Sequence, residues 1–142
     1  MKKRIGISVI LAAALIALLA FIPGCSQDDA PGNVIKVGVT GPMHFVQGQH
    51  HWYGAEMAAD EINEAGGIQV GDETYTIELV EVDTNEIQSV DDAVTAVERA
   101  IEVDQVDFLM GGFRTEAVFP YTETIADNEK IFFICGSATD EL

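Results

Sequence analysis

Hydrophobic residues follow two different patterns along the chain. Val9–Ile22 is an unbroken apolar run. From Val34 onward, short apolar runs alternate with segments in which apolar residues recur every three or four positions. The short runs predict strands and the spacing of three to four predicts amphipathic helices. The body of the chain is therefore predicted to alternate strands with helices.

The second pattern predicts four strands and three helices. The strands are expected at 34–39, 74–82, 106–110 and 131–135, and the helices at about 52–65, 90–101 and 115–128. Repeated strand–helix units with continuous apolar strands are typical of an α/β fold, a parallel sheet with helices on both faces. Right-handed crossovers favour the strand order 2-1-3-4.

The N-terminal apolar run follows Lys2, Lys3 and Arg4, and it is shorter than the roughly 20 residues that a membrane-spanning helix needs. It ends at Ile22-Pro23-Gly24-Cys25, which resembles a lipoprotein signal. We expect residues 1–24 to be the signal peptide, Cys25 to be lipidated and residues 25–33 to be a polar tether. The protein would then be extracytoplasmic and attached to the cell membrane only through Cys25. An ordinary signal or an uncleaved anchor, with Cys25 incidental, is the alternative.

The charge excludes two classes of partner. The 142 residues contain 7 Lys and Arg against 24 Asp and Glu, a formal net charge of −17. Residues 25–142 keep four of the basic residues and all 24 acidic ones, a difference of −20. Such a chain lacks the basic face that nucleic acid or an anionic membrane surface requires.

The motifs of the common enzyme and metal sites are missing. The sequence has no G-x-G-x-x-G, G-x-x-x-x-G-K-[ST], H-E-x-x-H or G-x-S-x-G. The three histidines, His44, His50 and His51, lie in one predicted loop, and adjacent His50 and His51 cannot easily share one ion. We therefore expect no enzyme, no cofactor and no metal site.

Ligands of parallel α/β sheets bind at the carboxyl ends of the strands, which here lead into 41–51, 111–115 and 136–139. Arg114 is the only basic residue in these loops, and a guanidinium can hold a carboxylate through two hydrogen bonds. The alternative is a surface arginine that neutralises Glu116.

Hydroxyl groups follow the fourth predicted strand. Ser137 and Thr139 could contact a ligand or could cap a helix. Cys135, inside the preceding apolar run, is expected to be a buried core residue.

Two segments resemble a known family. Lys36–Met43 (KVGVTGPM) and Gly54–Ile68 (GAEMAADEINEAGGI) are similar to the leucine/isoleucine/valine-binding type of ABC-transporter solute-binding proteins, and the resemblance extends from Lys36 to Leu142. It implies a two-lobed type I periplasmic binding protein that captures an amino acid, of branched-chain type, or a related amide for an ABC permease. A sensory receptor with the same clamp is the alternative.

The resemblance also implies which residues bind the ligand. They are Arg114 and Thr115 after the third strand, and Ser137, Ala138 and Thr139 after the fourth. Phe113-Arg114-Thr115 stands where serine-rich sequence is usual, which indicates a different acid, amide or urea-like ligand. Because such proteins have two lobes, residues 34–142 are expected to be the N-terminal part of lobe one, with lobe two absent and ligand binding weak in this segment alone.

Overall fold

The computed structural model describes residues 33–138. The elements, in chain order, are β1 (Asn33–Gly41), α2 (Val46–Glu64), β2 (Ile68–Val70), β3 (Glu73–Asp83), α3 (Val90–Glu102), β4 (Phe108–Gly111), α4 (Thr115–Asp127) and β5 (Ile131–Ile134). Every predicted strand and helix is present. The largest shift is at α2, which begins at Val46 rather than near Trp52, because its polar first turns carry no apolar repeat.

The strands form one five-stranded sheet in the order β2-β3-β1-β4-β5. The order predicted for the four main strands is confirmed, since β1 lies between β3 and β4, and β5 pairs with β4, all in parallel. The fifth strand, β2, was not predicted. It pairs antiparallel with β3 through the turn at Gly71 and Asp72, so the sheet is mostly rather than wholly parallel.

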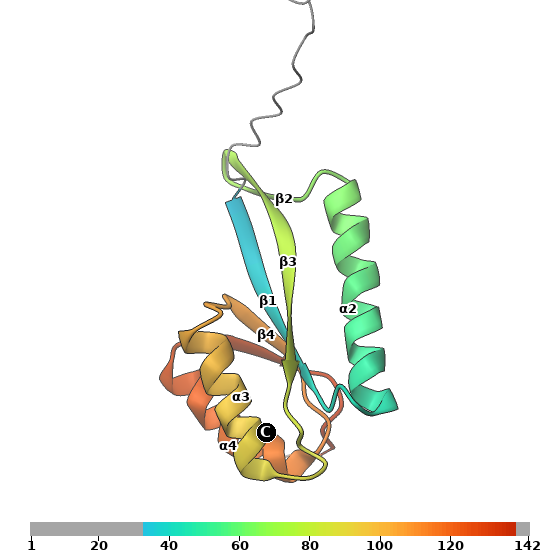
Figure 1. Cartoon of the computed structure of the whole chain (residues 1–142). Helices are drawn as coiled ribbons and strands as arrows, with labels where there is room; N and C mark the ends of the chain where they lie inside the picture. The colour runs from blue at the N-terminus through green and yellow to red at the C-terminus, as the bar shows by residue number, and fades with distance from the viewer. Residues whose placement is uncertain (1–32, 139–142) are drawn as a thin grey trace, which may run out of the picture. The chain divides into compact units, whose positions relative to one another are not determined.

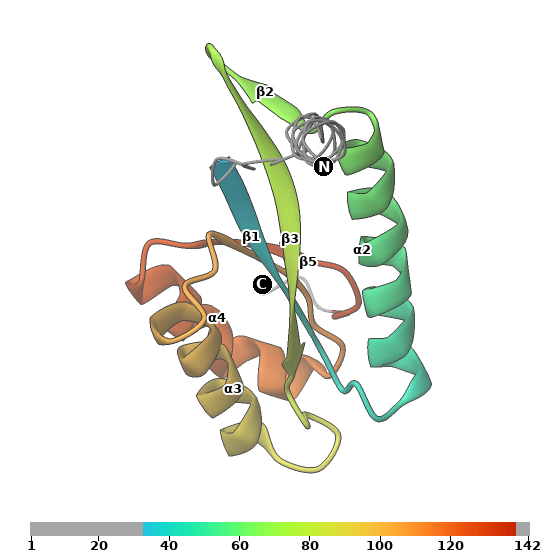
Figure 2. The ribbon, with the colours of Figure 1, turned by 45° about the horizontal axis from the view of Figure 1, so that its top comes forward.

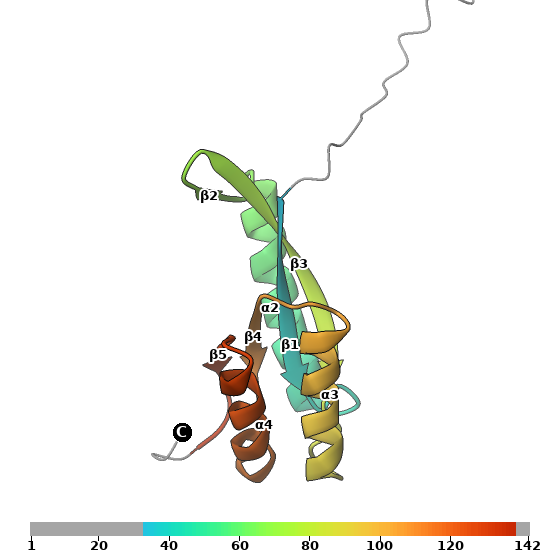
Figure 3. The same ribbon diagram turned by 90° about the vertical axis from the view of Figure 1, so that its left-hand side faces the viewer.

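Helices cover both faces, as predicted. Figures 1 and 2 show α2 on one side of the strands and α3 and α4 on the other, and Figure 3 shows α3 and α4 side by side. The core between the sheet and these two helices includes Val82, Val97, Leu109, Val118, Tyr121 and Ile125. Gly38, in the middle of β1, faces this core, where an added Cβ would lie 3.3 Å from Val106 Cγ1. The small residue leaves room for the side chains of Val82, Val106 and Leu109 over β1.

The other face is only partly covered. Helix α2 packs on β1 and β3 through the small residues Ala55 and Ala59, with Trp52 half-buried beside them. Beside α2 the sheet leaves an apolar groove of about 530 Å³, lined by Ile35, Val37, Ile68, Ile77, Phe108, Met110 and Phe133. Phe133, on the edge strand β5, is 62% exposed.

The prediction that Cys135 is buried in the core is wrong. Cys135 is exposed, directly after β5. The prediction assumed that the fourth strand is covered on both sides, but β5 is an edge strand that contacts a helix, α4, on one face. An apolar run at a sheet edge therefore does not imply full burial.

Within residues 33–138, no helix is both long and apolar enough to cross a membrane. The predicted signal peptide, Cys25, the tether up to residue 32 and Thr139 lie outside the part of the chain that the structure describes.

Candidate functional site

The loops that follow β1, β4 and β5 meet at one edge of the sheet. The N–H of Gly112 donates to the carbonyl of Thr40 (3.2 Å), and the N–H of Cys135 donates to the carbonyl of Gly111 (2.8 Å). The hydroxyl of Thr40 donates to the carbonyl of Met110 (3.1 Å). These bonds extend the strand pairing beyond the strand ends and place the three loops side by side.

Glycines make this close approach possible. Gly111 has a φ of +121°, and a Cβ there would overlap the carbonyl oxygen of Thr40. A Cβ on Gly136 would lie 2.7 Å from the carbonyl oxygen of Gly112. Larger residues would force the loops apart. The glycines after strands three and four, visible in the sequence, therefore mark the point where backbones touch.

His51 lies between the loops after β1 and β5. Its Nδ1 is 3.3 Å from the carbonyl oxygen of Thr40, and its Nε2 would be 3.5 Å from a Cβ on Gly136. The ring is half-buried. It comes from α2, so this helix contributes a side chain to the same edge.

Three of the predicted ligand residues come together. The N–H of Ala138 donates to Thr115 Oγ1 (3.4 Å), which joins the loop after β5 to the start of α4. The hydroxyl oxygen of Ser137 is buried and has no hydrogen-bond partner among residues 33–138. No side chain caps the N-terminus of α4, so Thr115 stands at an open helix end. Thr139, the fifth predicted position, is not described.

Arg114 is turned toward other parts of the protein. Its Nη1 donates to the carbonyl oxygens of Glu86 (3.2 Å) and Ile87 (3.4 Å), in the loop after β3. Its Nε lies 3.4 Å from Glu116 Oε2. The pairing with Glu116, raised as an alternative, is present. A ligand role for Arg114 stays a prediction.

Sequence reasoning missed Glu86, which is fully buried in the loop after β3. Its Oε1 accepts a hydrogen bond from the N–H of Phe113 (3.1 Å). Burial raises the pKa of this carboxyl above its ordinary value, and the N–H of Phe113 and the positive charge of Arg114 offset part of that rise. The one available signal was its position, at the same sheet edge as Arg114.

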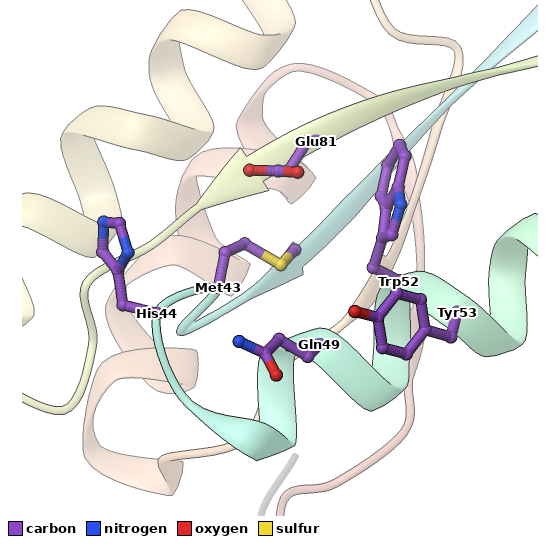
Figure 4. Close-up of a pocket in the computed structure, with 6 residues that line it drawn as sticks. All are labelled: Met43, His44, Gln49, Trp52, Tyr53 and Glu81. Atoms are coloured by element: carbon purple, nitrogen blue, oxygen red, sulfur yellow. The ribbon is translucent and has the colours of Figure 1, made fainter.

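A pocket of about 290 Å³ lies beside this edge, between β3 and the first turns of α2 (Figure 4). Glu81 reaches it from β3, Met43 and His44 from the loop after β1, and the remaining lining residues, Gln49, Trp52 and Tyr53, from α2. It contains none of the predicted ligand residues.

Asp83 fixes the loop at the mouth of this pocket. Its Oδ1 accepts hydrogen bonds from the N–H groups of Met43 (3.1 Å) and Asn85 (3.1 Å), and its Oδ2 lies 3.3 Å from His44 Nε2. In residues 33–138 there is no group of three or more His, Cys, Asp or Glu side chains that could hold a metal ion.

Comparisons with known proteins agree with this architecture. In sequence, the chain is 28% identical to an amino acid binding protein of Pseudomonas aeruginosa, over 99% of this chain and 35% of the relative. The chain therefore spans about a third of the length of that curated relative.

Several solved structures are similar, and two of them illustrate the likeness. One is the isoleucine complex of the substrate-binding protein of a branched-chain amino acid transporter from Streptococcus pneumoniae, with a TM-score of 0.67 and 21% identity over 77% of this chain and 30% of that chain. The other is a putative branched-chain amino acid ABC transporter protein from Silicibacter pomeroyi, with a TM-score of 0.63 and 28% identity over 75% of this chain and 26% of that chain.

The chain also matches a protein-family model. These relatives are named as binding or transporter proteins rather than as enzymes. A family model described as periplasmic binding protein matches residues 35–142, which include every helix and nearly every strand residue described above. The chain belongs to the periplasmic binding protein family.

Proposed function

We propose that the protein is an extracytoplasmic, lipid-anchored solute-binding protein that captures an amino acid of branched-chain type, or a related amide, and delivers it to an ABC permease. The observation that carries this proposal is the family match over residues 35–142. The P. aeruginosa relative is named for amino acid binding, and the S. pneumoniae structure contains isoleucine, which favours an amino acid as the ligand.

The ligand site would be the sheet edge where the loops after β1, β4 and β5 meet. The carboxylate of an amino acid suits the uncapped N-terminus of α4 and the hydroxyl of Thr115. The buried hydroxyl of Ser137 would supply a further polar group, and Ala138 and Thr139 are the other positions proposed to contact the ligand. A carboxylate there would give Ser137 the partner that it lacks among residues 33–138.

Calorimetry with the full-length protein tests this site. We expect L-leucine, L-isoleucine or L-valine to bind, and Thr115→Ala and Ser137→Ala each to weaken that affinity by about tenfold, the cost of losing one hydrogen bond to a charged group. Thr95→Ala is the matched control, because the Thr95 hydroxyl is exposed and bonds only to Asp91 within α3. Equal affinity of the Thr115 and control variants would contradict the site.

Arg114 would add a further contact to the ligand carboxylate. Its Nη1 and Nε already have protein partners, so the contact would be made by Nη2. In the full-length protein we expect Arg114→Ala to weaken affinity at least about tenfold. Arg99→Ala, on the exposed side of α3, is the control. Unchanged affinity in Arg114→Ala would leave Arg114 as a structural residue only.

The two cysteines of the chain allow a test of the anchor. We expect Cys25→Ala to abolish labelling by radioactive palmitate and to move the protein from the membrane fraction to the soluble fraction. Cys135→Ala, the control, should retain the label, because its thiol lies in the folded body. A labelled Cys25→Ala protein would contradict lipidation at this position.

A further inference from the structure

We propose that Glu86 is a positioning residue for ligand binding, which holds the loop 112–115 in its binding conformation through hydrogen bonds with Phe113 and Arg114. The inference rests on the proposed function, because this loop carries Arg114 and leads into Thr115.

The contacts between the two loops run in both directions. The side chain of Glu86 accepts from the backbone N–H of Phe113, while the backbone carbonyls of Glu86 and Ile87 accept from the side chain of Arg114. Two consecutive residues of the β4–α4 loop are thus tied to two consecutive residues of the β3–α3 loop. Each loop therefore contributes both a backbone group and a side chain to the contact, which restricts the movement of both loops.

The surroundings of Glu86 indicate that this residue does more than stabilise the fold. The residue is fully buried, and its second oxygen, Oε2, has no hydrogen-bond partner among the described residues. The hydroxyl groups of Thr84 and Tyr121, also buried, lack partners in that part of the chain too. A buried, incompletely bonded carboxyl costs stability relative to an apolar side chain. What the carboxyl supplies here is a fixed acceptor for Phe113.

The acceptor matters because the residue before Phe113 is a glycine. Gly112 has a φ of +80°, so the residue before Phe113 can adopt conformations that other residues disfavour. A hydrogen bond to Phe113 removes this freedom just before α4 begins. The groups at the start of α4 are then in place before a ligand arrives, which lowers the entropy cost of binding.

The experiment combines binding and a local probe of the loop in the full-length protein. Calorimetry measures the affinity for L-isoleucine, and NMR measures hydrogen exchange of the Phe113 amide. Glu86→Ala removes the acceptor, whereas Glu86→Gln keeps an oxygen acceptor and removes the charge. Glu98→Ala, an exposed carboxylate on α3, is the matched control.

We expect Glu86→Ala to speed exchange at Phe113 and to weaken isoleucine binding by about tenfold, while Glu86→Gln stays within about threefold of wild type because the acceptor is kept. If Glu86→Ala does not fold, Glu86→Gln provides the test. Slow exchange at Phe113 in Glu86→Gln supports the positioning role. Fast exchange at Phe113 together with wild-type-like binding in Glu86→Gln contradicts it. Folded Glu86→Ala that binds isoleucine as tightly as Glu98→Ala also contradicts it. A wild-type protein that binds no branched-chain amino acid would instead contradict the proposed function, and exchange at Phe113 would still test the positioning.

Discussion

Glu86 holds an ionisable group where water does not reach, and this gives the protein a specific dependence of stability on pH. Burial raises the pKa of Glu86 above the ordinary 4.5. Arg114 faces the carboxyl from the β4–α4 loop and Tyr121 from α4, and burial also raises the pKa of Tyr121, which keeps that phenol neutral. Between 4.5 and its raised pKa, the folded protein holds a proton on Glu86 that the unfolded chain releases.

The contribution of Glu86 to stability is therefore present below pH 4.5 and lost as pH rises through the raised pKa. Glu86→Gln cannot titrate. Between pH 4.5 and the raised pKa, we expect the unfolding free energy of wild type to fall relative to that of Glu86→Gln. Above that pKa, the difference between the two proteins should stay constant. Urea denaturation from pH 4 to 8 measures both free energies. Parallel curves across the whole range would show that burial does not shift this carboxyl.

The sequence could not reveal Glu86. Acidic residues are common in this chain, and a carboxylate in a loop is usually exposed. Its burial results from segments that are distant in sequence and that bring Phe113, Arg114 and Tyr121 to it. The location of Thr115 and Ser137 at this sheet edge was predictable, because each lies a few residues beyond a strand end and strand ends can be recognised from short-range patterns. Their role in ligand binding stays a prediction.

At the scale of elements, one glycine allows α2 to approach the loop after β1 closely. A Cβ on Gly48 would overlap the backbone of Pro42, so the first turns of α2 touch the loop after β1 directly. Gly54, in the same helix, has no atom within 4 Å of an added Cβ. Substitution of Gly48 therefore tests a steric requirement, whereas substitution of Gly54 tests helix propensity alone.

We expect Gly48→Ala to lower the unfolding free energy by about 2 kcal/mol, because the added methyl must displace backbone. Gly54→Ala should raise it by about 0.5–1 kcal/mol, because alanine is the better helix former. Urea denaturation of both variants provides the measurement. A Gly48→Ala protein as stable as Gly54→Ala would mean that α2 does not approach Pro42 this closely.

Elements with strong local signals were predictable. The helix predicted at 90–101 is present as α3, and the hydroxyl of Ser89, directly before it, accepts the N–H of Asp92. β2 was not predictable, because Ile68–Val70 has only three residues and contains a glutamine. It pairs with Glu73–Tyr75 along the edge of β3 that faces away from β1.

At the scale of the whole molecule, the open face of the sheet should be detectable. On β5, Phe133 lines the apolar groove, whereas Phe132 packs against the opposite core with its ring edge-on to Tyr121, 5.7 Å between centroids. The two neighbours point to opposite faces, as strand residues do.

We expect Phe133→Ser to lower the fluorescence of bound 8-anilinonaphthalene-1-sulfonate and to change the unfolding free energy by less than about 0.5 kcal/mol. Phe132→Ser should instead destabilise by about 2 kcal/mol. Equal destabilisation by the two substitutions would show that the Phe133 side of the sheet is covered in solution.

The α/β architecture and the order of the main strands were predictable because repeated strand–helix units and right-handed crossovers leave few alternatives. How much of the sheet the helices cover was not predictable from the sequence. The pattern of α2 shows that it has an apolar face, but not that this face packs mainly on β1 and β3. Cys135 was misjudged for the same reason, since a run of apolar residues does not tell an edge strand from a central one.

The central position of β1 has a consequence for the order of events during folding. Val37 pairs with Leu79 on one side and with Phe108 on the other, 42 and 71 residues further along the chain. The first strand to leave the ribosome thus waits for both of its partners, and contacts of such large sequence separation form slowly. If residues 1–24 act as the predicted signal, this delay keeps the chain unfolded while it is being delivered to the membrane. The strand order that brings these loops to one sheet edge would then also favour export before folding.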